Sequence, residues 1–351
     1  MTRFVHEAAA SRVVFGAGRV AETPAELEKL GERALLIADG SAARLETGFW
    51  RGLSSVAAAT IDEVRQHVPV EDADGARALA RKRGADSILA LGGGSTVGLA
   101  KAVALTERLP ILAVPTTYAG SEMTPVWGLT DAGVKTTGRD LGVAPATVIY
   151  DPELTYSLPA STTAASGLNA IAHCADALWA SGRNPLTDTM AERGIASLTA
   201  GLPGAVADGT DAEARELCLV GAWLAGATFA AAGSSLHHKL CHVLGGRFDL
   251  PHAETHAIVL PWATALAVEQ VPDAGAILGR ALGVSDPVAG LRDLAARLGA
   301  PSRLAQLGLT RDQALDLADQ IPLKALATPF PVSRDALRTL LLEATVGPDQ
   351  A

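Results

Sequence analysis

The sequence predicts an α/β domain built on a parallel sheet, followed by a domain made only of helices. In residues 1–153, short apolar runs with strand character alternate with helical stretches, which is typical of βαβ units. In residues 154–351, strand-like runs disappear, and Ala- and Leu-rich segments with helical periodicity follow one another. Two domains with these bounds suit a chain of 351 residues.

Each element of the first domain follows from its local pattern. A leading pair of short strands is expected at the sheet edge near residues 12–18. Buried strands are predicted over 33–40, 55–64, 87–94, 111–117 and 147–152. Helices are expected between them over 21–31, 72–84 and 95–107. In the second domain, helices are predicted over 197–209, 214–233, 261–271, 274–284 and 333–345.

Composition narrows the class of protein. Hydrophobic residues make up 48% and charged residues 19% of the chain, which argues against disorder. The net charge of −9 disfavours a nucleic-acid partner. The three cysteines, an odd number without a CxxC motif, indicate reduced thiols. The sequence has neither a signal-peptide core at its start nor an uninterrupted apolar run of membrane-spanning length. We therefore expect a soluble cytoplasmic protein.

A glycine loop is the clearest local signal in the first domain. In LGGGSTVGLAKAVAL, residues 91–105, a predicted strand runs through three glycines into a helix. Glycines let the backbone approach a phosphate, and the N-terminus of a helix offers free N–H groups to it. The pattern indicates pyrophosphate binding, although it is not the GxGxxG fingerprint and does not follow the first strand. The alternative is a tight structural turn.

Two further segments fit dinucleotide binding. The loop PTTYAGSE, residues 115–122, also follows a predicted strand and carries the hydroxyls of Thr116, Thr117 and Ser121. Asp39 ends the strand at 33–40, where a carboxylate can accept hydrogen bonds from a ribose diol. Such a carboxylate would repel a 2′-phosphate and so favour NADH over NADPH. The alternative for Asp39 is a turn residue in Asp-Gly.

Histidines cluster in the second domain. Four of the eight lie in HHKLCHVLGGRFDLPH, residues 237–252, and His256 follows. His238 and His242 are four apart and share a helix face, and His252 comes after a Gly-Gly break and a proline. Upstream, Asn169 and His173 are also four apart. A single histidine is usually a core or surface residue, but this set looks like a divalent-metal site between helices.

The motifs GGGSTVGLAK, PTTYAGSEMTP, GLNAIAHCADALWA, HHKLCHVLGG and LPHAETHAIVLP together resemble the iron-containing alcohol dehydrogenase family. The resemblance spans nearly the whole chain. It implies a Rossmann-like dinucleotide-binding domain and a helical domain in a dehydroquinate synthase-like architecture, with the active site between them. It also implies that an Asp and three His hold the metal, and these positions are here Asn169, His173, His238 and His252.

Asn169 departs from this pattern, because an amide oxygen is neutral and a weaker ligand than a carboxylate. The maleylacetate reductase branch of the family resembles the chain more closely, and its members are thought to work without metal. The resemblance implies reduction of maleylacetate to 3-oxoadipate with NADH or NADPH, late in the catabolism of aromatic rings. The partners implied are a small dicarboxylate substrate and a second copy of the chain in a homodimer.

Roles for individual residues follow from the resemblance. His242, outside the inherited quartet, is expected to donate the proton. His173, His238 and His252 would hold the carboxylates or carbonyl of the substrate, with Asn169 as a hydrogen-bond donor. His237 and Lys239 are candidate carboxylate partners or solvent-facing residues. The cofactor would contact Gly93, Gly94 and Ser95 at its pyrophosphate, Thr116, Thr117 and Ser121 near its phosphate and nicotinamide, and Lys135 and Asp39 at its riboses.

Three other functions remain compatible with the sequence. The first is a metal-dependent alcohol dehydrogenase or reductase in which Asn169 is still a ligand. The second is a lyase or synthase that uses NAD only transiently, for which more Lys and Arg around the site would be expected. The third is a non-catalytic NAD-binding sensor, which would leave the imidazole cluster without a purpose.

Overall fold

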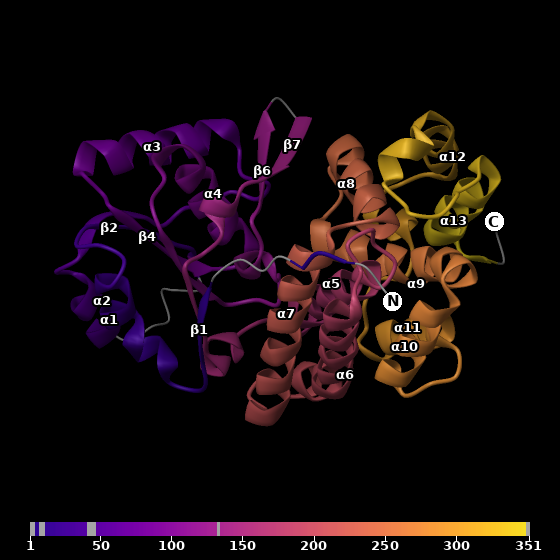
Figure 1. Cartoon of the computed structure of the whole chain (residues 1–351), viewed down its shortest axis with the longest axis horizontal. Helices are drawn as coiled ribbons and strands as arrows, with labels where there is room; N and C mark the ends of the chain where they lie inside the picture. The colour runs from indigo at the N-terminus through magenta and orange to yellow at the C-terminus, as the bar shows by residue number, and fades with distance from the viewer. Residues whose placement is uncertain (1–3, 7–10, 41–46, 132–133, 349–351) are drawn as a thin grey trace. The chain divides into compact units, whose positions relative to one another are not determined.

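The computed structural model describes residues 4–6, 11–40, 47–131 and 134–348. The chain divides into two compact units, Ala8–Leu158 and Pro159–Ala351, the second joined by Met1–Glu7. Figure 1 shows the strands in the first unit and the long helices in the second. Among the described residues, no single helix is long and apolar enough to cross a membrane. Ala212–Ala232 and Leu236–Phe248 would qualify as a pair by length and composition, but the chain bends by 98° between them.

The first unit is built on one six-stranded sheet in the order β1-β8-β5-β4-β2-β3. Every neighbouring pair in it is parallel, which confirms the predicted fold class. The inner strands are buried along their whole length, as their continuous apolar sequences require. The strands are β1 Arg12–Phe15, β2 Ala34–Ala38, β3 Ala57–Ile61, β4 Ser87–Gly92, β5 Ile111–Pro115 and β8 Thr147–Tyr150.

The predicted leading strand pair is wrong: β1 is a single strand that pairs with β8 at the sheet edge. Gly16 and Gly18 follow it with positive φ angles and lead the chain into a 3-10 helix, η1 Arg19–Glu22. The helices of this unit are α1 Thr23–Glu28, α2 Thr47–Leu53, α3 Val70–Arg83 and α4 Gly94–Glu107. Short 3-10 turns complete it: η3 Ser121–Met123, η4 Leu141–Val143 and η5 Pro152–Thr155.

An antiparallel hairpin, β6 Val126–Asp131 with β7 Val134–Arg139, was not predicted. It forms a separate two-stranded sheet after η3. The Trp127 ring lies over Gly138, where an added Cβ would come within 2.5 Å of Trp127 Cζ2. This glycine therefore makes room for a cross-strand aromatic contact that the sequence pattern did not reveal.

The second unit is helical throughout its described residues and has α5 at its centre. From Thr163 to Ala177 every residue of α5 is buried, and α6, α7, α8 and α9 all pack against it. Small residues permit close packing: a Cβ at Gly194 would lie 2.8 Å from Cys174 Sγ. The helices are α5 Ala160–Ala177, α6 Pro185–Ala207, α7 Ala212–Ala232, α8 Leu236–Phe248, α9 His252–Gln270, α10 Pro272–Leu282, α11 Pro287–Arg297, α12 Arg311–Gln320 and α13 Arg334–Val346. The 3-10 turns η6 Leu304–Leu307 and η7 Leu323–Leu326 lie between the last of these.

The helices of the histidine segment differ from expectation at two points. Gly245 and Gly246 do not break the helix but lie inside α8, which ends at Phe248 and is followed by the C-cap residue Asp249 in a left-handed conformation. Helix α9 begins at His252 behind Pro251, well before the predicted start at Pro261. Pro fits just before or at a helix start because its φ is already helical and its missing N–H is not needed there. His252 is thus placed on the first turn of α9.

Candidate active site

The glycine loop joins β4 to α4, as expected. Gly93 is the N-cap of α4 and offers no capping side chain, so the N-cap residue leaves the first N–H groups at the positive end of the helix dipole unoccupied by its own side chain. Gly92 precedes it with φ of +153°, and an added Cβ would lie 2.1 Å from Asp39 Oδ2 and 2.5 Å from Thr96 Oγ1. Gly92 is therefore the most constrained residue of the loop. Sequence reasoning singled out Gly93, Gly94 and Ser95 but missed it.

Asp39 stabilises this loop through hydrogen bonds. Its Oδ2 accepts hydrogen bonds from the Gly93 N–H at 2.8 Å and from Thr96 Oγ1 at 2.9 Å. The carboxylate therefore stabilises the glycine loop. Sequence reasoning considered a ribose contact or a turn residue for Asp39, but not this role. Its contact with a ribose stays a prediction.

The loop after β5 adjoins the glycine loop. The Thr116 N–H donates to the Gly92 carbonyl at 3.1 Å, and a Cβ at Gly93 would be 3.3 Å from Thr117 Cγ2. The structure therefore brings Thr116 and Thr117 beside the expected phosphate site. Lys135 lies on β7 and pairs with Thr130 on β6. The side chain of Lys135 lies outside what the structure describes.

Lys101, in the same unit, fixes the position of Ser121 by hydrogen bonds. The Lys101 Nζ donates to Ser121 O at 2.5 Å and Ser121 Oγ at 3.1 Å, and also to Thr124 Oγ1 and Val126 O. Lys101 is fully buried, and this burial lowers its pKa to about 7. Sequence reasoning missed this lysine, which fixes the shape of the loop that carries Ser121.

Gly92→Ala should weaken NADH binding at least about tenfold, because a Cβ would push Asp39 and Thr96 out of the loop. Strained backbone of this kind costs about 1–3 kcal/mol. Fluorescence titration with NADH measures the loss of affinity, and thermal unfolding measures the loss of stability. Gly75→Ala is the matched control, since a Cβ there meets nothing within 4 Å on helix α3. Equal NADH affinity in both variants would contradict the role given to this loop.

Six histidines gather in the second unit, and we call them the histidine cluster: His173 on α5, His237, His238 and His242 on α8, and His252 and His256 on α9. The ring centroids of His173 and His238 lie 4.7 Å apart in a stacked arrangement. Those of His238 and His242 are 6.3 Å apart, and those of His242 and His252 are 6.4 Å apart. The structure therefore brings together all four residues predicted as catalytic.

His256, which was noticed in the sequence but given no role, lies in the middle of the cluster. Its ring centroid is 4.2 Å from that of His252 and 4.6 Å from that of His238. It is fully buried. Its spacing of four from His252 on α9 was the signal that could have placed it on the same face.

Burial differs across the cluster. His252 is exposed and His242 half-buried, whereas His173, His237, His238 and His256 are buried. Burial lowers the pKa of His173 to about 3 and of His237 to about 4, and it holds the pKa values of His238 and His256 well below the usual range. The interior of the cluster is therefore neutral at physiological pH.

Asn169 lies one helical turn before His173 on α5, and both are buried. Among the described residues, Asn169 Oδ1, His173 Nδ1 and His238 Nε2 are buried without a hydrogen-bond partner. Buried polar atoms are almost always satisfied in native proteins, so these three indicate a place for a polar ligand or water.

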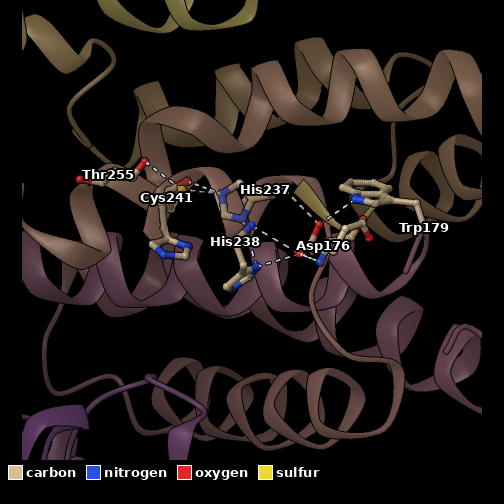
Figure 2. Close-up of polar contacts among 9 residues, drawn as sticks. Asp176, Trp179, His237, His238, Cys241 and Thr255 are labelled. Atoms are coloured by element: carbon tan, nitrogen blue, oxygen red, sulfur yellow. Dashed lines mark hydrogen bonds and ion pairs between the residues drawn. The ribbon is translucent and has the colours of Figure 1, made fainter. Parts of the chain in front are cut away.

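Asp176 is a residue of the histidine cluster's surroundings that sequence reasoning also missed, and Figure 2 shows it beside His238. Its Oδ2 accepts from the Ser235 N–H at 2.7 Å and lies 3.1 Å from His238 Nδ1. Its Oδ1 accepts from Trp179 Nε1 at 2.8 Å and from the His237 N–H at 3.2 Å. Asp176 thus caps the N-terminus of α8 from α5, and burial raises its pKa to about 6.

His237 and Lys239 have different surroundings. His237 is fully buried, and its Nε2 lies 3.0 Å from the His256 carbonyl oxygen. This placement argues against both the carboxylate contact and the solvent-facing position considered for it. Lys239 is half-buried on α8, and its contact with substrate stays a prediction.

Comparison with known proteins agrees with these two units. The first matches the iron-containing alcohol dehydrogenase model over residues 10–152, and the second matches the C-terminal model of the Fe-containing alcohol dehydrogenase family over residues 163–345. The chain belongs to the iron-containing alcohol dehydrogenase family. As a member, it is an oxidoreductase with the architecture of that family, as the sequence predicted.

Individual members of the family are similar over almost their full length. The chain is 47% identical to a maleylacetate reductase of Sphingobium indicum over 98% of each chain, and 47% identical to one of Burkholderia cepacia over 99% of each. The crystal structure of a maleylacetate reductase from Agrobacterium tumefaciens superposes with a TM-score of 0.92 at 45% identity, covering 99% of each chain.

The family name implies a metal, and the residues present fit one poorly. Asn169, His173, His238 and His252 provide no negative charge, and the nearby carboxylate of Asp176 is committed to backbone N–H groups and to His238 Nδ1. Among the described residues, the triplet with ligand atoms within 4.8 Å of one another is instead His237, Cys241 and His256. That triplet is not ready for a metal either, because His237 Nε2 already faces a carbonyl oxygen.

Asn169→Asp should raise the affinity for Zn²⁺ or Fe²⁺ by on the order of 10²-fold or more, because it supplies the missing negative charge beside three imidazoles. Calorimetric titration of metal into chelator-treated protein measures the change. His173→Ala in the Asn169→Asp background is the control and should abolish the gain. Equal metal affinity in the wild-type protein and the Asn169→Asp variant would show that the amide is already an adequate ligand.

Proposed function

We propose that this protein reduces maleylacetate to 3-oxoadipate with NADH or NADPH, in the catabolism of aromatic compounds, and that it needs no metal. The proposal is carried by similarity over nearly the full length to proteins named maleylacetate reductase. It is supported by a buried, uncharged set of polar atoms where the family would place a metal ligand set.

The first unit is proposed to bind the dinucleotide. The N-cap residue of α4 is Gly93, and the free N–H groups of the first turn of this helix would bind the pyrophosphate. When bound, the reduced dinucleotide supplies the hydride. Asp39 would repel a 2′-phosphate, which favours NADH over NADPH.

The second unit is proposed to bind the dicarboxylate and supply a proton. Conjugate reduction adds a hydride to the carbon–carbon double bond of the enone, and the adjacent carbonyl spreads the charge that develops. A proton from His242 then completes the reduction. His242 suits this role because it is half-buried and lies between the exposed His252 and the buried His238.

Burial revises how the other histidines would hold the substrate. The sequence assigned the carboxylates or carbonyl of the substrate to His173, His238 and His252, but the lowered pKa of His173 leaves it neutral at physiological pH. A neutral imidazole can donate a hydrogen bond without offsetting the charge of a carboxylate. Charged contacts are therefore assigned to the more accessible His252 and Lys239, while Asn169 and His173 supply neutral hydrogen bonds.

The proposal includes a cytoplasmic homodimer that has no nucleic-acid or membrane partner. Cys174, Cys218 and Cys241 are buried thiols outside any disulfide, which suits a reducing compartment. The net charge of −9 disfavours binding to nucleic acid.

The deciding experiment is NADH oxidation in the presence of maleylacetate, after exhaustive dialysis of the protein against a chelator. Rapid turnover without added metal, giving one 3-oxoadipate per NADH consumed, is the expected result. Turnover that returns only with Zn²⁺, Fe²⁺ or Mn²⁺ would replace this proposal with the metal-dependent alternative. No turnover of maleylacetate under either condition would reject the substrate.

A further inference from the structure

The hydrogen-bond network around His238 has two ends whose roles are fixed by chemistry. The His256 carbonyl oxygen can only accept, so His237 Nε2, 3.0 Å away, must carry the hydrogen of that contact. A neutral His237 then has its lone pair on Nδ1. This Nδ1 lies 3.2 Å from Nδ1 of His238.

The second fixed end is Asp176. Its carboxylate already accepts from the Ser235 N–H and the His237 N–H, and Oδ2 lies 3.1 Å from His238 Nδ1. An ionised carboxylate can only accept hydrogen bonds. Both neighbours of His238 Nδ1 are therefore acceptors, and this nitrogen must carry the hydrogen, as Figure 2 allows the reader to follow.

We propose that Asp176, aided by His237, is a positioning residue that holds His238 in the Nδ1–H tautomer and presents its Nε2 to the bound ligand as a hydrogen-bond acceptor. The inference deepens the proposed function, on which its catalytic consequence rests. Its structural part concerns the protein alone. Nε2 is the ring nitrogen that is buried without a hydrogen-bond partner among the described residues, so its lone pair is available to a donor.

This assignment restricts what His238 can contact. An acceptor nitrogen can meet an O–H, an N–H or a cation, but it repels a bare carboxylate or carbonyl oxygen. A substrate oxygen can therefore approach Nε2 only through a bridging donor such as a water molecule. It also follows that His238 does not donate the proton of the reduction, which leaves that role to another member of the histidine cluster.

The tautomer can be read directly in the wild-type protein without substrate. In ¹⁵N-histidine-labelled protein at neutral pH, long-range proton–nitrogen correlation spectra separate protonated from unprotonated ring nitrogens. The signal of His238 is assigned by its loss in His238→Gln. We expect a protonated Nδ1 and an unprotonated Nε2. The opposite pattern would overturn the inference.

Asp176→Asn tests the role of the carboxylate. The amide keeps an oxygen for backbone N–H groups but can turn an NH₂ toward His238 Nδ1, which should shift the hydrogen to Nε2. The same exchange in a serine protease triad costs about 10⁴-fold in kcat through the wrong tautomer, and we expect a kcat loss on the order of 10²-fold or more here with little change in NADH affinity. An unchanged His238 spectrum in a folded Asp176→Asn protein would reject the positioning role.

Cys241→Ala is the matched control, because Cys241 is buried on α8 and its Sγ lies 3.7 Å from His237 Nε2. It should perturb packing while leaving the His238 tautomer and kcat within about threefold of wild type, which is under 1 kcal/mol. The experiments distinguish a failure of the proposed function from a failure of the proposed role of Asp176. The expected spectrum without turnover of maleylacetate would reject the substrate alone, and turnover with the opposite tautomer would reject the inference alone.

Discussion

His242→Ala is expected to lower kcat for maleylacetate by about 10²–10⁴-fold, the usual contribution of a positioned general acid. His242 is half-buried on α8, with its ring between those of His238 and His252. The buried His173 and His237 are poor substitutes, because their lowered pKa values leave few protonated molecules at neutral pH. Steady-state kinetics with saturating NADH measures the loss.

The control for this prediction is NADH binding, which should not change, because the glycine loop belongs to the other unit. Because His242 is half-buried, small exogenous acids such as imidazolium should restore part of the activity. Turnover of the alanine variant within about threefold of wild type, a difference below 1 kcal/mol, would show that the proton comes from elsewhere.

Acid should destabilise the second unit strongly. The pKa of His237 is lowered from 6.5 to about 4 and that of His173 to about 3, chiefly by burial. Between each lowered value and 6.5 the unfolded chain binds a proton that the folded chain does not, so the free energy of unfolding falls as the pH falls through this window. His237 alone would contribute about 3 kcal/mol by pH 4.

Asp176 opposes this effect, because its pKa is raised to about 6 and the folded state binds its proton first. Protonation of Asp176 stabilises the folded state as the pH falls from about 6 toward 3.8. This is the effect of one group, whereas several buried histidines act in the opposite direction. Urea unfolding at pH 7.5, 6 and 4.5, in the presence of chelator, measures the net result. His256→Leu removes one buried imidazole and should flatten the curve. Equal unfolding free energy at all three pH values would contradict the prediction that the buried histidines dominate the pH dependence.

The sequence predicted the fold well where one physical signal dominated. Continuous apolar runs marked the strands of the parallel sheet, because both of its faces are covered. The β6–β7 hairpin was not recognised because β6 is only half-buried and Thr136, Thr137 and Arg139 on β7 are exposed, so no buried apolar run among the described residues marks it. The contact between Trp127 and Gly138 also joins residues eleven apart. The break between α8 and α9 was misplaced because Gly245 and Gly246 were taken as a stop, although glycine is tolerated inside a helix at modest cost.

The site shows a similar division. Spacings of four linked His238 to His242 and Asn169 to His173, and the family resemblance joined His252 to them. The structure places the four histidines together. Asp176 could not be recognised in the same way. Its partners are backbone N–H groups of a helix that begins some sixty positions later, and such contacts leave no periodic trace in a sequence.

The buried amine of Lys101 has a consequence for following motion in solution. Lys101 is fully buried and its amine donates hydrogen bonds to the segment Ser121–Val126, yet with a pKa of about 7 much of the amine is in the unprotonated, nucleophilic form at neutral pH. An acylating reagent can reach it only when that segment lifts away. The rate at which Lys101 is modified, followed by peptide mass spectrometry, therefore reports how often the segment Ser121–Val126 opens. Any ligand that holds this segment closed should lower the rate of modification.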